Sequence, residues 1–148
     1  MANSANLRLV TVAGEGLRFG VTTGSGQSTV IDSGTGMIAP SPVEMLLVAL
    51  ASCTAMDVIS ILRKKRQQVT AYEIAIRGER RPEHPRSYTH IEIGHHFTGH
   101  DLSPEAIAHA IDLSHHRYCS VQASLDPAIE VTNRFEIVAG GAPAREPE

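Results

Sequence analysis

The hydrophobic pattern of this chain changes from short alternating segments to one long apolar run and then back to alternation. Near the N-terminus, three short segments are rich in alternating or β-branched apolar residues, at residues 7–12, 17–21 and 29–31. Glycine-containing turns separate these segments. Alternation of apolar and polar side chains is typical of strands with one buried face. The pattern therefore predicts three short strands before the first helix.

The apolar run covers residues 45–62 and predicts a central helix. Ser41 is a good N-cap, Pro42 suits the first helical position, and Glu44 completes a capping box three residues after Ser41. Asp57 lies inside the run, and a charge in the middle of a membrane is costly, so we expect no membrane span. A helix that is apolar on nearly all sides needs cover from sheets or from a second copy of itself.

The second half of the chain predicts longer strands around a second helix. Apolar and polar residues alternate over residues 72–76, 91–97 and 129–137. Ser103 and Pro104 supply an N-cap and a first helical residue, and Ile107, Ala110 and Ile111 then form an apolar stripe. A short helix carrying Cys119 is expected after this second helix.

Length and charge narrow the class of protein. The chain has 148 residues, and we expect one domain over 1–138 and a disordered polar tail over 139–148. Its 13 basic and 16 acidic side chains give a net charge of −3, so nucleic acid is not an expected partner. Two cysteines are too few for a secreted disulfide scaffold, and the N-terminus does not resemble a signal peptide, so the cytoplasm is the expected compartment.

The two cysteines are the main candidates for chemistry. Cys53 lies in the middle of the apolar run, whereas Cys119 follows the polar residues 115–118. A thiolate can attack a peroxide oxygen, and a second thiol can capture the resulting sulfenic acid as a disulfide. The alternative is that both cysteines only fill the core, because a free cysteine packs like a small hydrophobic residue.

The histidines offer a separate hypothesis of a metal site. His95 and His96, His115 and His116, and Cys119 three residues later are potential ligands. His116 and Cys119 share a face only if one helix runs through both, and neighbouring strand residues such as His95 and His96 point to opposite faces. Because no CxxC or HExxH pattern accompanies them, we expect neither a metal nor another bound cofactor.

The residues around both cysteines resemble the motifs of the OsmC-like family, which includes osmotically inducible and organic hydroperoxide resistance proteins. The first motif is SPVEMLL at residues 41–47, leading to ASCTAMDV at residues 51–58. The second is YCSV at residues 118–121, followed by the final strand. The sequence of residues 58–66 and 85–91 most resembles that of the YhfA-type branch of the family.

This resemblance implies an α+β fold in which antiparallel sheets wrap the paired central helices of an intertwined homodimer. It also implies a thiol peroxidase, with Cys53 as the peroxidatic residue and Cys119 as the resolving residue of a Cys53–Cys119 disulfide. The implied partners are an organic hydroperoxide substrate and an external dithiol reductant.

Three further residues are supporting candidates at the thiols. Well-understood family members have a glutamate directly after the proline of the helix start, where this chain has Val43 and then Glu44. Glu44 and Cys53 face opposite sides of one helix, so Glu44 either caps the helix or reaches a partner subunit's site. The peroxidase branches also supply an arginine, for which Arg18 and Arg86 are candidates, although strand alternation turns Arg18 away from the core.

The main alternative function is a non-catalytic dimer that binds a small apolar ligand or senses the redox state on the same fold. The two functions differ in redox behaviour. Catalysis predicts that a hydroperoxide consumes both thiols, whereas thiols that stay unmodified under excess peroxide favour ligand binding.

Overall fold

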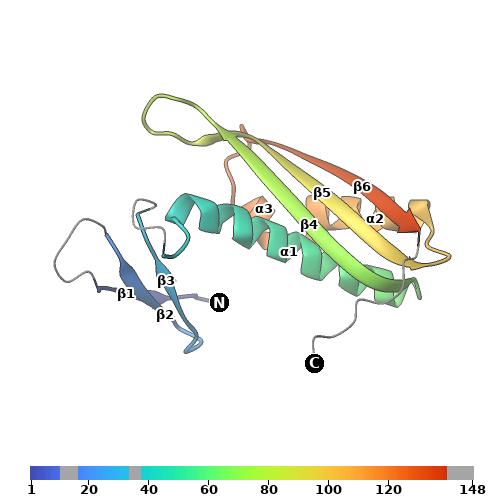
Figure 1. Cartoon of the computed structure of the whole chain (residues 1–148), viewed down its shortest axis with the longest axis horizontal. Helices are drawn as coiled ribbons and strands as arrows, with labels where there is room; N and C mark the ends of the chain where they lie inside the picture. The colour runs from blue at the N-terminus through green and yellow to red at the C-terminus, as the bar shows by residue number, and fades with distance from the viewer. Residues whose placement is uncertain (11–16, 34–37, 140–148) are drawn as a thin grey trace. The chain divides into compact units, whose positions relative to one another are not determined.

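The computed structural model describes residues 1–10, 17–33 and 38–139. Met1–Val48 form one compact unit and Ala49–Glu148 a second, and Figure 1 labels their elements. A single domain over residues 1–138 stays a prediction. Of the predicted tail, Ala139 is the last residue of a strand, and residues 140–148 lie outside the described part of the chain.

The first unit contains a three-stranded antiparallel sheet with the strand order β1-β2-β3. Its strands are β1 (Ala5–Leu9), β2 (Phe19–Thr23) and β3 (Ser28–Ile31). The turn between β2 and β3 contains Gly26 at φ 85°, a left-handed conformation that glycine adopts without steric cost. The three predicted strands are thus confirmed, with residues 11 and 12 of the first one outside the described part of the chain.

Helix α1 (Pro42–Lys64) begins with the predicted capping box. The backbone N–H of Glu44 donates to Ser41 Oγ at 3.3 Å, and the N–H and hydroxyl of Ser41 both donate to Glu44 Oε2 at 2.8 Å. The hydrogen bond from the Ser41 backbone N–H lowers the pKa of Glu44 most, and the bond from the Ser41 hydroxyl lowers it further. This local network fixes where the helix begins.

The buried side of α1 is a stripe rather than its whole circumference. The stripe consists of residues one turn apart, Leu50, Thr54, Val58 and Leu62. Val48 and Met56 are 50% and 69% exposed, so a single chain covers one side of the helix, and cover of the other side by a second copy stays a prediction. By length and a hydropathy of 2.1 alone α1 would suit a membrane span, but a buried stripe is typical of an amphipathic core helix.

The second unit contains a three-stranded sheet with the order β4-β5-β6. Its strands are β4 (Gln68–Arg80), β5 (Tyr88–His100) and β6 (Glu130–Ala139). β4 and β5 form an antiparallel hairpin, whereas β6 runs parallel to β5. The α+β class is confirmed, but this sheet is mixed rather than antiparallel, because the helices between β5 and β6 form a crossover connection.

Helix α2 (Pro104–Leu113) packs with α1 against one face of this sheet (Figure 1). Ser103 Oγ accepts a hydrogen bond from the Ala106 N–H at 3.2 Å, which confirms the predicted cap. The predicted stripe is also the observed one, since the core consists of Val58, Leu62, Phe97, Ile107, Ala110 and Ile111.

A π-helical turn, η1 (Ser114–Tyr118), separates α2 from the short helix α3 (Ser120–Ala123). The Cys119 N–H donates to the Ser114 carbonyl at 2.9 Å, and Cys119 itself is extended at φ −70° and ψ 101°. Cys119 therefore caps α3 instead of lying within a helix. Because the helix is interrupted here, His116 and Cys119 do not share a helical face.

A buried histidine lies in the central strand β5. His95 is 0% exposed, its Nδ1 is 2.8 Å from the Tyr72 hydroxyl, and its Nε2 is 3.0 Å from Asn133 Oδ1. Asn133 Oδ1 can only accept, so Nε2 carries the proton and Nδ1 accepts from Tyr72. Burial lowers the pKa of His95, and the opposing effect of the Asn133 hydrogen bond does not cancel it.

We therefore expect the free energy of unfolding to fall as the pH drops below 6.5, the ordinary histidine pKa. In that range the unfolded chain binds a proton that folded His95 does not, so acid favours unfolding. The pKa of His115 is also lowered, mainly by burial and to a smaller extent by the neighbouring His116. This residue therefore adds to the loss of stability in acid. Urea unfolding above and below this pH should show that His95→Leu flattens the dependence, while His109→Gln, at an exposed site, keeps it. An unchanged dependence in His95→Leu would contradict this account.

Candidate functional site

The fold brings the two cysteines together although 66 positions separate them in the sequence. The sulfur atoms of Cys53 and Cys119 and a carboxylate oxygen of Asp57 all lie within 4.8 Å of one another. Both cysteines are free thiols. A disulfide bond of about 2.05 Å would require the sulfurs to approach by up to about 2.7 Å, a movement within the range of side-chain rotation.

The two thiols differ in their surroundings. Cys53 lies on α1 and is partly exposed, whereas Cys119 is only 3% exposed. Cys119 Sγ accepts a hydrogen bond from the Gln122 N–H at 3.3 Å, and Thr54 Oγ1 lies 3.9 Å from the same sulfur. Burial raises the pKa of Cys119, the Gln122 bond opposes this effect, and the neighbouring Cys53 thiol adds to the rise. Cys119 is therefore held as a neutral thiol.

Local backbone geometry explains why the thiols meet. Cys53 lies beside the buried stripe of α1, directly before Thr54, which contacts Cys119. On the other side, the π-helical turn ends at Cys119 and places its extended backbone at the start of α3. Irregular turns of this kind occur often at functional sites, where they re-aim a side chain.

Asp57 is the residue that the sequence analysis missed as part of this site. Its only role there was as an argument against a membrane span. Asp57 follows Cys53 by four residues, a spacing that puts both side chains on the same face of a helix and would have identified it. The buried Ser114 hydroxyl donates to Asp57 Oδ2 at 3.0 Å and fixes the carboxylate beside the sulfurs.

Each predicted supporting residue has a local partner. Arg18 lies in the first unit, where its Nε and Nη2 both donate to Asp32 Oδ2 at 3.2 Å. Burial disfavours the Asp32 charge, but the Ser33 backbone bond and Arg18 outweigh it and lower the pKa of Asp32. Arg86 donates to the Pro82 carbonyl at 3.0 Å in the turn between β4 and β5. Glu44 forms the capping box, so the roles of all three at the thiols remain predictions.

The histidines have partners other than the thiols. His96 Nδ1 lies 2.6 Å from a carboxylate oxygen of Glu136, and His116 Nε2 lies 3.6 Å from one of Asp112. In the described part of the chain, the group of potential metal ligands that comes together contains Cys53, Asp57 and Cys119 and no histidine.

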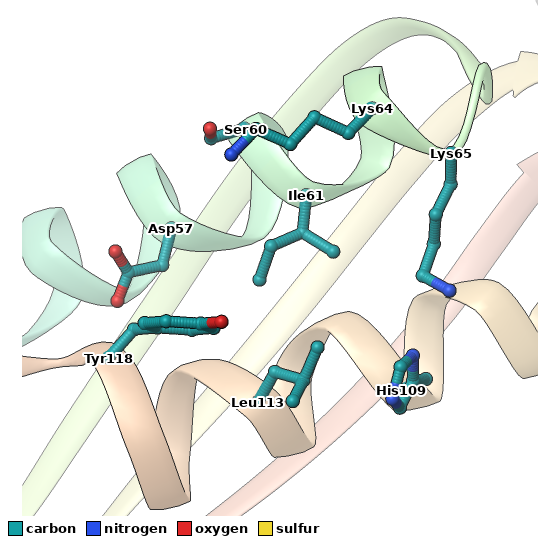
Figure 2. Close-up of a pocket in the computed structure, with 8 residues that line it drawn as sticks. All are labelled: Asp57, Ser60, Ile61, Lys64, Lys65, His109, Leu113 and Tyr118. Carbon is teal, nitrogen blue, oxygen red and sulfur yellow. The ribbon is translucent and has the colours of Figure 1, made fainter.

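A pocket of about 430 Å³ opens beside Asp57, between α1 and the segment formed by α2 and η1 (Figure 2). Its lining combines apolar and charged side chains: Asp57, Ser60, Ile61, Lys64, Lys65, His109, Leu113 and Tyr118. Asp57 therefore belongs both to the lining of this pocket and to the group around the two sulfurs. The arrangement offers a space for a small molecule next to two thiols.

This chain is similar to known proteins along most of its length. The sequence pattern described as "OsmC-like protein" matches residues 33–134 of this chain. Protein YhfA of Escherichia coli (strain K12) is 46% identical over 125 residues, which cover 84% of this chain and 93% of that protein. Because this match extends over 84% of the chain, it includes both cysteine motifs.

Solved structures show the same fold. A hypothetical protein from Aquifex aeolicus VF5 is 31% identical, with a TM-score of 0.82 over 95% of this chain and 99% of that chain. The organic hydroperoxide resistance protein OhrB of Bacillus subtilis shares the fold alone, with 12% identity and a TM-score of 0.61 over 92% of this chain and 98% of that chain. With the family pattern extending from residue 33 to residue 134, and with a 46% identical relative along most of its length, this chain belongs to the OsmC-like family.

Proposed function

We propose that the protein is a thiol-dependent peroxidase that reduces organic hydroperoxides through Cys53 and Cys119. The observation that carries this proposal is the distance between the two sulfurs, which lie within 4.8 Å of one another. Membership of the OsmC-like family supports a redox role, and one protein of the same fold is named an organic hydroperoxide resistance protein.

The proposed reaction has three steps. The Cys53 thiolate attacks the distal oxygen of ROOH, the O–O bond breaks, and the alcohol ROH leaves with a proton while Cys53 becomes a sulfenic acid. The Cys119 thiol then attacks the Cys53 sulfur, which releases water and forms the disulfide. An external dithiol finally reduces the disulfide by exchange and becomes a disulfide itself.

The different surroundings of the thiols suit this division of roles. Cys53 is partly exposed and can meet a substrate, whereas Cys119 is buried, and this burial raises its pKa. An apolar wall of the adjacent pocket, formed by Ile61, Leu113 and Tyr118, suits the organic group of a hydroperoxide. A cytoplasmic location, where thiols are kept reduced, is part of the proposal.

The active protein is proposed to be a homodimer. Val48 and Met56 are exposed on the side of α1 that faces away from its buried stripe, and Leu7 and Leu9 on β1 are 60% and 55% exposed. Apolar side chains grouped on an exposed face mark interaction surfaces. A second copy that packs along α1 would bury the uncovered side of this helix.

One equivalent of cumene hydroperoxide should consume both thiols of the reduced protein, because the second thiol captures the first oxidation product. Free thiols are counted with a chromogenic disulfide reagent after the reaction. Cys53→Ser should abolish turnover, and Cys119→Ser should stop at a sulfenic acid that dimedone traps. Ser120→Ala, at an exposed neighbouring position, is the control and should react like the wild type. Thiols that survive excess hydroperoxide would favour the non-catalytic ligand-binding or sensing dimer.

Light scattering coupled to gel filtration should give twice the mass of one chain. Met56→Lys should shift the protein toward the monomer, because it places a charge in the proposed interface. Ala128→Lys, which adds the same charge at an exposed loop position, should leave the dimer intact. A monomeric wild type, or a dimer that tolerates Met56→Lys, would contradict an interface along α1.

A further inference from the structure

The position of a carboxylate between two thiols has no role in the peroxidase chemistry proposed above. A carboxylate supplies no positive charge that could stabilise a thiolate during attack on a peroxide. The buried Ser114 hydroxyl nevertheless holds Asp57 in this place at 3.0 Å. A carboxylate beside two thiols becomes favourable when a divalent cation lies among them.

The three donor atoms lie within about 1 Å of the spacing of a tetrahedral zinc site. Zn–S distances of about 2.3 Å and Zn–O distances of about 2.0–2.2 Å place donors about 3.5–3.8 Å from one another in a tetrahedron. The atoms of Cys53, Asp57 and Cys119 lie within 4.8 Å, so movements of about 1 Å would complete the geometry. The donors come from two elements, α1 and the start of α3, which are packed together.

Neighbouring groups already orient these donors. Ser114 is fully buried and donates to Asp57 Oδ2, and the Gln122 N–H donates to Cys119 Sγ at 3.3 Å. Hydrogen bonds of this kind fix ligand orientation in metal sites. Two sulfur donors and one carboxylate favour zinc over magnesium or calcium, which prefer oxygen donors alone.

The site also has an open side. Asp57 lines the pocket of about 430 Å³ shown in Figure 2, so a fourth ligand can be water or a small molecule from that pocket. Three protein ligands and one exchangeable position are typical of zinc sites that are not purely structural. Lys64 and Lys65 line the same pocket and make part of its lining positively charged.

We propose that the reduced protein binds one Zn²⁺ ion through Cys53 Sγ, Cys119 Sγ and the Asp57 carboxylate, with its fourth position open to the pocket. Binding releases the two thiol protons to solvent, and the ion then blocks both sulfurs. Once the ion has dissociated and the thiols have regained their two protons, a hydroperoxide oxidises them to the disulfide and gives ROH and water, and the disulfide no longer offers the two sulfur ligands. Zinc occupancy and peroxide reduction therefore exclude one another.

Cobalt titration of the full chain, reduced and metal-free under anaerobic conditions, tests the site. One equivalent of Co²⁺ should produce thiolate-to-cobalt charge transfer and the intense visible bands of tetrahedral cobalt, and Zn²⁺ should abolish both. Asp57→Asn should weaken binding at least tenfold while leaving both thiols titratable, and Ser114→Ala should weaken it about 10–100-fold. Ser60→Ala, at another pocket residue, is the control and should bind like the wild type.

The absence of a charge-transfer band in the wild type would overturn the proposal, as would wild-type affinity in Asp57→Asn. Alkylation with iodoacetamide tests the site without any variant. One equivalent of Zn²⁺ should protect both cysteines from this reagent. Unprotected cysteines would refute the site. Oxidation of the same metal-free protein by cumene hydroperoxide is measured in parallel, so a failed zinc site and a failed peroxidase are distinguishable.

Discussion

The packing of α1 against the π-helical turn and the start of α3 is the constraint on which the proposed function of this protein depends. Thr54, in the buried stripe of α1, lies against Cys119, and Ser114, at the start of the turn, holds Asp57. These contacts join segments separated by more than fifty residues and bring two sulfurs within 4.8 Å. Without this packing, Cys53 and Cys119 would be two unrelated core residues.

The same packing places a carboxylate beside the two sulfurs. Burial and the neighbouring thiol keep Cys119 neutral, and the charged group held beside both sulfurs is a carboxylate. A cation beside a thiolate would stabilise it for attack on a peroxide. A carboxylate beside two thiolates instead serves as a further ligand of a divalent metal ion. The protein thus joins a thiol pair suited to disulfide formation with a ligand set suited to zinc, and the redox state of the pair decides between the two proposed states.

Local features of the fold could be predicted from the sequence, whereas the composition of the site depended on tertiary contacts. The Ser41 and Ser103 caps involve residues three positions apart, and the stripe of α2 follows from helical periodicity, so short windows of sequence suffice. The parallel pairing of β6 and the capping position of Cys119 depend on how distant segments meet. Asp57 was missed because its four-residue spacing from Cys53 shows a shared face but not what packs against it.

The most direct test of the central claim is peptide mapping of the protein under non-reducing conditions after reaction with one equivalent of an organic hydroperoxide. The account predicts one species in which the peptides carrying Cys53 and Cys119 are joined within a single chain and two hydrogens are lost. Separate peptides, either unmodified or carrying independently oxidised sulfurs, would contradict the claim that the fold makes these thiols a reactive pair.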